Sequence, residues 1–327
     1  MHRDLEKWLS DTWKGREKIF EGLSKNGRAI LAQPIGKHQG IQKVYSLYTA
    51  GGEDVVVTGG DGDLPAALRE LAKLVNAKQA NCVIQSEGWI DASVEDLMEL
   101  AGGSTLTFQI TDEEGELKLV QISPDTLDWD FIHVRHPIKF PSGGTDQRIY
   151  LNLSLMGRGS SFREIVELVY DHPGFRSAKV MLTDGDPRND TALLYLAGEV
   201  AVKYAIGVLT NYQKVHKGAF RPALPRLTAP EAGLVGVGRG MEPPDFAVIR
   251  RGGKYYKKTA AMSFGWWRAA LIFMALDRTK WDRSGQGEAE RLKAFKRRAA
   301  KYFVAAGIDP DNPSVQKNPT TLSEYVG

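Results

Sequence analysis

The stretch SAKVMLTDGDPRNDTALLYLAG, residues 177–198, contains most of the pattern that decides the fold. Its two apolar runs, residues 178–183 and 191–196, have the length and composition of buried strands. The turn-forming residues DGDPRND lie between them and predict a tight loop. The stretch therefore predicts two strands joined by a loop, with Lys179 in the first strand and Arg188 in the loop.

The flanking sequence continues this pattern in both directions. Downstream and immediately upstream, a βαβ-like order is expected, with a strand over 148–155 and helices over 161–170, 199–212, 263–276 and 288–306. Towards the N-terminus the expected helices are 3–25, 64–77 and 93–101, and the expected strands are 44–48, 55–58, 81–85, 105–110 and 117–122. The resulting fold class is α+β, with a mixed or antiparallel sheet flanked by helices.

A boundary between two domains is expected near residues 137–147, which contain two prolines and two glycines. We therefore expect a small α+β N-terminal domain over 1–140 and a second domain over 141–327. The charge also changes there, because the first part has a net charge of −7 and the second a net charge of +10. A basic second domain favours an anionic partner, although two solvated faces of opposite sign would give the same counts.

Composition excludes several classes of protein. The longest apolar run, residues 269–276, is far shorter than the roughly 20 residues that a membrane-spanning helix needs. The charged N-terminus lacks the apolar core of a signal peptide. The single cysteine, Cys82, excludes an intrachain disulfide and fits a reducing compartment. We expect a bacterial cytoplasmic protein with no membrane or nucleic-acid partner.

Familiar catalytic and metal-binding motifs do not fit. The DGDPRND loop fails as a calcium loop, because Arg188 and Tyr195 stand where oxygen ligands are required. The glycine-rich stretches 59–62 and 233–240 lack the patterns of phosphate-binding loops. The basic face of the helix over 288–306 is explained by solvation. We expect no metal and no cofactor.

A set of cations distributed along the second domain indicates phosphate chemistry. Arg148, Lys179 and Arg188 lie on or beside neighbouring strands, while Arg226 and Arg268 lie further along the chain. Arginine binds phosphate through paired hydrogen bonds, and neighbouring cations can tune a lysine into a base. Spacing alone leaves this a weak signal.

Residues 135–276 resemble the HopA-like family, which includes a type III effector of plant pathogens and enzymes of peptide natural-product pathways. The ordered motifs that carry the resemblance are RHPIKFP, RIYLNLSL, DTALLYLAG, FRPALPRLTAPEAGLVGVGRGMEPP and SFGWWRAALIFMAL. The N-terminal part, residues 1–134, resembles no family known to us.

The resemblance implies a fold similar to that of phosphothreonine lyases and a metal-independent carbon–oxygen lyase activity. Such a lyase eliminates phosphate from phosphoserine or phosphothreonine of a ribosomal precursor peptide and leaves dehydroalanine or dehydrobutyrine, as in lanthipeptide and thioamitide biosynthesis. The implied partners are the phosphorylated precursor peptide, with leader and core, and a kinase-like protein.

The same resemblance implies roles for individual residues. Lys179 resembles the lysine base, and Arg188, Arg148, Arg226 and Arg268 are implied in phosphate binding. Tyr150 stands where the family has a histidine, so the general acid is Tyr150 or His136, or no acid is used.

Two further functions stay open at this point. The chain is either a phosphopeptide-binding component of a kinase-containing complex without activity of its own, or a secreted type III effector. The N-terminal domain either covers the second domain or binds a leader peptide or the kinase, with 55–58 as a candidate edge strand.

Overall fold

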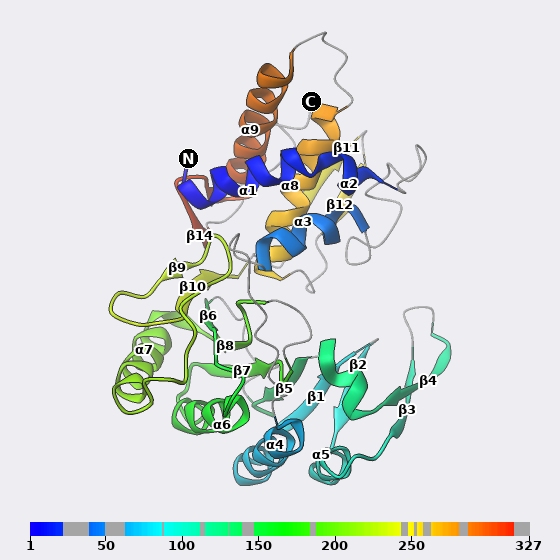
Figure 1. Cartoon of the computed structure of the whole chain (residues 1–327), viewed down its shortest axis with the longest axis vertical. Helices are drawn as coiled ribbons and strands as arrows, with labels where there is room; N and C mark the ends of the chain where they lie inside the picture. Colours follow the sequence, from blue (N-terminus) through cyan, green and yellow to red (C-terminus); the bar gives the residue numbers. More distant parts are fainter. Residues whose placement is uncertain are drawn as a thin grey trace. The chain divides into compact units, whose positions relative to one another are not determined.

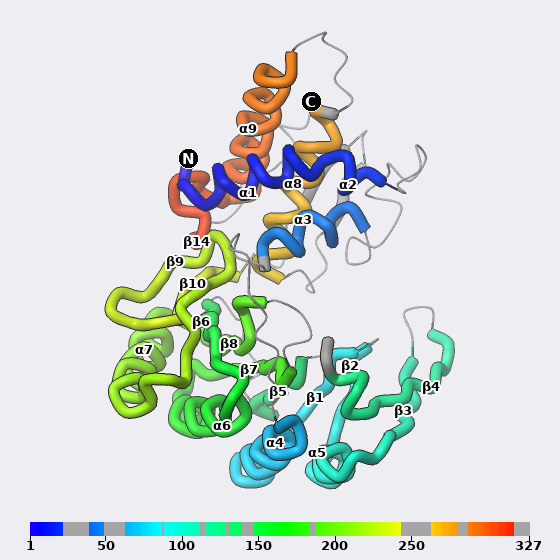
Figure 2. The backbone as a smooth tube through the Cα atoms, viewed as in Figure 1, coloured from blue at the N-terminus to red at the C-terminus, as the bar shows by residue number. Residues whose placement is uncertain are grey.

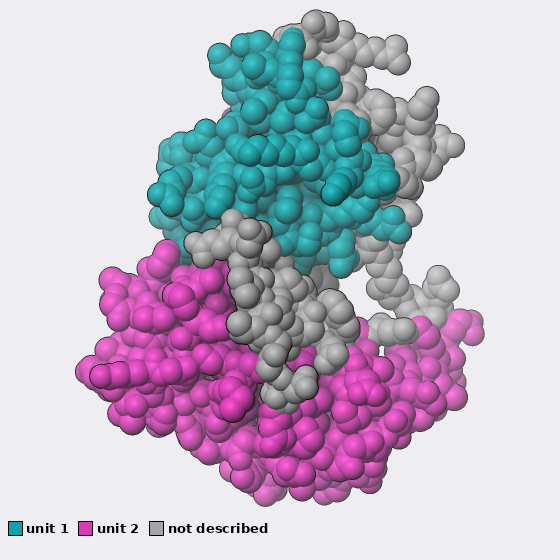
Figure 3. Space-filling model, in the orientation of Figure 1, with its two compact units in different colours: residues 1–54, 225–229, 240–327 teal, residues 55–224, 230–239 magenta. Residues whose placement is uncertain are grey.

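The computed structural model of the chain describes residues 1–21, 39–49, 63–86, 88–111, 115–129, 131–138, 147–183, 188–242, 248–251, 254–257, 263–280 and 287–316. It divides into two compact units, which Figure 3 shows in separate colours. One unit comprises residues 1–54, 225–229 and 240–327, and the other comprises residues 55–224 and 230–239.

The second of these units is built on an eight-stranded sheet with the order β2-β1-β5-β7-β8-β6-β10-β9. The pairs β1–β2, β1–β5, β5–β7, β7–β8 and β6–β8 are all antiparallel. The strands are β1 (Asn81–Gln85), β2 (Trp89–Ala92), β5 (Phe131–Arg135), β6 (Gln147–Leu151), β7 (Phe175–Val180), β8 (Ala192–Leu196), β9 (Ala229–Pro230) and β10 (Val237–Met241).

Helices cover one face of this sheet, where α4, α5, α6 and α7 gather (Figures 1 and 2). Their apolar residues form one core with the strand residues that point to that face. The core-facing strand residues include Ile84, Val134, Ala178, Leu194 and Ile149. The helices are α4 (Leu64–Lys78), α5 (Val94–Ala101), α6 (Arg158–Val169) and α7 (Gly198–Val215), and a separate hairpin is formed by β3 (Leu106–Thr111) and β4 (Leu117–Ile122).

The predicted fold class is confirmed: the chain is α+β with a large antiparallel sheet flanked by helices. The expected helix at 93–101 begins with a capping box, since the Ser93 hydroxyl accepts from the Asp96 amide and the Asp96 carboxylate accepts from the Ser93 amide. Strands β2 and β5 were not among the expected strands.

The other unit is mainly helical. Its core combines aliphatic side chains with large aromatic ones, and the Trp8 indole donates to the carbonyl of Val44 at 3.2 Å. Its elements are α1 (Arg3–Lys14), α2 (Arg16–Phe20), α3 (Gln39–Thr49), α8 (Phe264–Lys280), α9 (Glu288–Ala305) and the hairpins β11 (Val248–Arg251) with β12 (Lys254–Lys257) and β13 (Ile308–Asp309) with β14 (Asn312–Gln316).

The strand expected at residues 44–48 is wrong, because these residues lie in helix α3. Ile41, Val44 and Tyr48 are buried, and their spacing of three and four residues places them on one face of a helix. Packing also explains a glycine in the SFGWWR motif, since a Cβ at Gly265 would collide with the Tyr48 ring. The glycine therefore allows α3 and α8 to approach closely.

The predicted boundary at residue 140 does not coincide with the two units. Strand β5 precedes this boundary and β7 follows it, yet they pair along their whole length. In the chain, the proline and glycine residues that suggested a linker therefore lie between β5 and β6, which are two strands of the same sheet. The strand expected over 55–58, with its possible role in leader binding, lies outside the described residues.

Candidate functional site

The face of the sheet opposite the helices carries the polar side chains. Residues that pair directly across neighbouring antiparallel strands point to the same face. Lys179 on β7 pairs with His133 on β5 and with Leu193 on β8, and Leu193 pairs with Tyr150 on β6. These four residues form one row across the sheet. The next row contains Arg148 and Tyr195, which pair with each other.

Lys179 is the centre of this face. Its side chain is partly buried, and its Nζ lies 3.8 Å from the centroid of the Phe131 ring. Burial is the main cause that lowers the pKa of Lys179 to about 7, the positive charges of Arg148 and Arg188 lower it further, and Asp190 opposes the shift. Near neutral pH a substantial fraction of the molecules therefore carries an uncharged amine at this position.

Two arginines flank Lys179. Arg148 is buried and places its guanidinium 4.7 Å from the centroid of the Tyr195 ring. Arg188 follows the loop after β7, and it donates to both carboxylate oxygens of Asp190, from Nε at 2.9 Å and from Nη2 at 3.0 Å. The forked pair fixes the direction of the Arg188 guanidinium, which lies 5.2 Å from the Phe131 ring centroid.

The lowered pKa of Lys179 predicts how the free energy of unfolding depends on pH. The unfolded chain keeps the Lys179 pKa near its ordinary value of 10.5, and the folded chain holds it at about 7. Between these two pH values the unfolded state binds more protons than the folded state. The free energy of unfolding therefore increases as the pH rises, and the destabilisation by the Lys179 ammonium is complete below about pH 7. We expect Lys179→Met to remove the penalty and to raise the free energy of unfolding at pH 6.

The size of this effect follows from the shift. One pKa unit corresponds to about 1.4 kcal/mol, and solvent access to the partly buried ammonium reduces the full value, so we expect a gain of about 1–3 kcal/mol. At pH 9 the increase in the free energy of unfolding should be about half of that at pH 6. Urea denaturation of both proteins at the two pH values measures this increase. The matched control is Lys203→Met at an exposed lysine of α7, which should show no such pH dependence. An equal gain at both pH values would contradict the assignment.

His133 is the residue of this site that the sequence did not assign. Its Nε2 lies 2.9 Å from the Gln85 Oε1, and its ring lies between Trp89 and Tyr195 at centroid distances of 4.9 and 6.5 Å. Burial and the cations Lys179, Arg135 and Arg148 hold the pKa of His133 well below its ordinary value. The imidazole is therefore neutral at physiological pH. Only the pairing of β5 with β7 places it beside Lys179, and that pairing is not visible in the local sequence.

Neither of the two candidates for the general acid, Tyr150 and His136, lies next to Lys179. Tyr150 is buried in the same row as Lys179, but Leu193 lies between them, so their backbones are about 10 Å apart at the usual strand spacing. His136 stacks on Tyr170, a residue of the core beneath the sheet, with ring centroids 4.9 Å apart. The structure thus brings His133, and not His136, next to Lys179.

The remaining predicted phosphate ligands belong to the helical unit. Arg226 is buried and donates from Nη2 to the Asp11 carboxylate at 2.7 Å. Arg268 is fully buried in α8, where it donates to the carbonyls of Pro313 at 2.9 Å and Phe264 at 3.1 Å. Both guanidinium groups therefore have partners inside their own unit.

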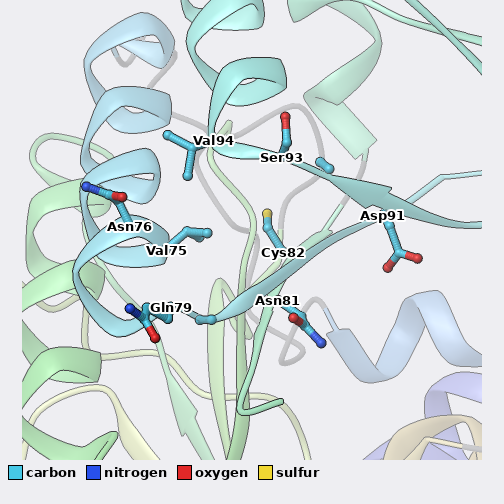
Figure 4. Close-up of a pocket in the computed structure, with 10 residues that line it drawn as sticks. Val75, Asn76, Gln79, Asn81, Cys82, Asp91, Ser93 and Val94 are labelled. Atoms are coloured by element: carbon cyan, nitrogen blue, oxygen red, sulfur yellow. The ribbon is translucent and has the colours of Figure 1, made fainter.

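A separate cavity of about 450 Å³ lies between the C-terminal end of α4 and strands β1 and β2 (Figure 4). Its lining includes Asn76, Gln79 and Asp91, with Cys82 buried at its floor. Burial raises the pKa of the Cys82 thiol to about 12, so this group is not a nucleophile near neutral pH. Its lining residue Asp91 pairs with Val83, which pairs with His133, so this carboxylate lies on the same face of the sheet as Lys179.

Within the described residues, no group of three or more His, Cys, Asp or Glu side chains is placed to hold a metal ion. Among the described helices, none is long and apolar enough to cross a bilayer.

Fold and site together define an α+β protein with a positively charged sheet face and an amine of low pKa at its centre. Among the described residues of this face, three arginines, Arg135, Arg148 and Arg188, outnumber the two nearby carboxylates, Asp91 and Asp190, so its charge is complementary to a phosphate. An uncharged amine held near a bound phosphate is suited to removing a proton from the phosphorylated molecule.

Comparisons with known proteins give the fold a context. No family model matches the chain, and no curated protein matches it. The solved structure of an effector protein from Pseudomonas syringae pv. tomato strain DC3000 is similar, with 17% identity, a TM-score of 0.54, and coverage of 94% of this chain and 100% of that chain. An effector protein from Pseudomonas syringae pv. syringae strain 61 is similar at 14% identity and a TM-score of 0.55, covering 96% of each chain. This chain therefore has the fold of these effector proteins.

Proposed function

We propose that this protein is a HopA-like carbon–oxygen lyase that eliminates phosphate from phosphoserine or phosphothreonine in a ribosomal precursor peptide. The observation that carries the proposal is Lys179, whose pKa of about 7 leaves an uncharged amine between Arg148 and Arg188 at neutral pH. A protein that only bound phosphopeptides would gain more from a charged lysine, since attraction to phosphate requires the ammonium form.

The reaction assigns one task to each group. The Lys179 amine removes the Cα proton of the phosphorylated residue and becomes an ammonium. The electron pair of the C–H bond forms the Cα–Cβ double bond, and the bond between Cβ and the phosphate oxygen breaks. Arg148 and Arg188 stabilise the phosphate as its negative charge increases. The products are dehydroalanine or dehydrobutyrine and inorganic phosphate.

His133 supplies the proton that the leaving phosphate needs. Breaking the C–O bond of a phosphate dianion would release a trianion unless a proton is transferred to it. The pKa of His133 is depressed by burial and by nearby cations. A bound phosphate dianion opposes the effect of those cations, so the substrate itself favours protonation of His133.

The chemistry of the substrate implies the partners. A kinase-like protein must supply the phosphorylated peptide, and the precursor peptide, with leader and core, is the common substrate. Since both proteins act before export of the product in this proposal, we expect this protein in the bacterial cytoplasm.

The test is mass spectrometry of a phosphorylated precursor peptide incubated with the purified protein. We expect the phosphopeptide to lose the mass of phosphoric acid as inorganic phosphate appears in equal amount. If the phosphopeptide binds in calorimetry but is not converted, the result would contradict the lyase proposal. It would favour a phosphopeptide-binding component without catalytic activity.

The fold favours a second candidate, a secreted effector, because the similar structures are effector proteins of Pseudomonas syringae. The substrate then would be a phosphorylated host protein, since the residues around Lys179 are the same in both readings. Elimination from a host phosphoprotein, with no reaction on precursor peptides, would favour the effector.

A further inference from the structure

The proposed chemistry leaves one feature of the site unused, the indole of Trp89. Its residue is 54% exposed on β2, the first strand in the order of the eight-stranded sheet. The ring contacts His133 edge to face at a centroid distance of 4.9 Å, and the Arg135 guanidinium lies 4.6 Å from the ring centroid. Two residues of the site thus hold an indole that keeps half of its surface in solvent.

Strand register fixes the distance between Trp89 and the reacting centre. Trp89 pairs with Gln85, and Gln85 pairs with Phe131, so the three side chains form one row on the same face. Two strand spacings separate Trp89 from Phe131, which is about 10 Å. The Phe131 ring in turn contacts the Lys179 Nζ at 3.8 Å. An extended peptide covers this distance with about three residues, at about 3.3 Å per residue.

Physical chemistry indicates what the indole contacts. Tryptophan is rigid and large, and it is enriched among the few residues that dominate binding energy at interfaces. Keeping its ring in water has no benefit for the stability of the fold. An immobilised indole that adjoins a cationic site fits a ligand with an anionic group at one end and an apolar group about 10 Å away.

We propose that Trp89 determines the sequence specificity of the site by holding an apolar or aromatic side chain about three residues from the phosphorylated residue of the peptide. The inference rests on the proposed function in one respect, namely that the anion is a phosphopeptide. It goes further because it names a sequence feature of the substrate.

The experiment uses calorimetry with two kinds of probe. The first is a series of peptides with one phosphothreonine in a background of glycine, serine and alanine, and with one leucine or phenylalanine moved from five residues before to five residues after it. The second probe is inorganic phosphate. We expect an affinity gain of about tenfold when the apolar residue lies two to four positions away on one side.

Variants of the full chain assign the gain to the indole. Trp89→Ala should abolish the gain and leave the affinity for inorganic phosphate within about twofold, the scale of a surface substitution. Trp89→Phe should restore part of the gain. The matched control is Leu119→Ala, which removes an apolar side chain that is 68% exposed on the β3–β4 hairpin and should change neither affinity.

Three results would overturn the inference: no positional preference, a preference that Trp89→Ala retains, or an equal loss of affinity for inorganic phosphate. The last result would mean that Trp89 only positions Arg135 and His133. These binding measurements are independent of elimination. A protein that shows the preference without eliminating phosphate contradicts the lyase proposal alone, and one that eliminates phosphate without the preference contradicts the specificity inference alone.

Discussion

Lys179→Arg should reduce the rate of phosphate elimination by at least about 10³-fold while the phosphorylated peptide still binds. The guanidinium of arginine stays protonated near neutral pH, so the variant keeps a cation beside Arg148 but has no base. Mass spectrometry should show the phosphopeptide accumulating unchanged in the presence of the kinase. Calorimetry with the same peptide measures whether binding persists.

The wild-type protein provides a second measurement of the same group. The mechanism needs Lys179 neutral and His133 protonated, so kcat/KM follows the fraction of free protein that carries one proton on this pair. It should therefore fall as the pH rises above about 7, the pKa of the Lys179 amine. Lys179→Met should be as inactive as Lys179→Arg, although the two differ in charge. Elimination by Lys179→Arg at a rate near that of the wild type would show that Lys179 is not the base.

Arg188→Ala should weaken phosphopeptide binding by roughly 2–3 kcal/mol, or about 30- to 150-fold, the scale of a lost charged hydrogen bond. The structure adds a second cost, because Asp190 is only 4% exposed and would lose its forked partner. An unpaired carboxylate at this position repels phosphate and raises the pKa of Lys179. Isothermal titration with the phosphopeptide measures the loss.

A double variant separates these two causes. Arg188→Ala combined with Asp190→Ala removes the arginine without leaving the carboxylate unpaired, so it should recover part of the affinity that Arg188→Ala loses. The remaining loss then measures the contact between Arg188 and phosphate. If Arg188→Ala binds the peptide as tightly as the wild type does, Arg188 has no phosphate role.

The fold was predictable from the sequence where a helix has an apolar face over several turns or where a strand contains several apolar residues. Helices α4, α5, α6 and α7 and strands β1, β3, β4 and β8 lie within a few residues of their expected positions. Residues 44–48 were misread because VYSLY alternates like a strand, while the burial of Val44 and Tyr48 depends on contacts with distant helices. Tertiary packing decided this short segment.

The site was predictable only in part, for a similar reason. Lys179 and Arg188 are close in sequence, so one motif contains both. His133 reaches Lys179 through the register of β5 with β7, and no local pattern encodes that register. Arg226 and Arg268 show the converse problem. The residue type suited phosphate, but carbonyls and Asp11 within the helical unit already engage these side chains.

The helical unit joins the two ends of the chain, and this has a consequence for synthesis on the ribosome. The Trp13 indole in α1 donates to the Glu288 carboxylate at 2.7 Å and stacks on Phe295 of α9. Helix α1 leaves the ribosome long before its partner α9, because more than 270 residues separate the two helices. Residues 55–239 include all residues of the sheet-containing unit, and they emerge before α9. The nascent chain therefore completes the sheet with its Lys179 face before α1 finds its final partner, and the apolar face of α1 stays without α9 while the residues between the two helices are synthesised.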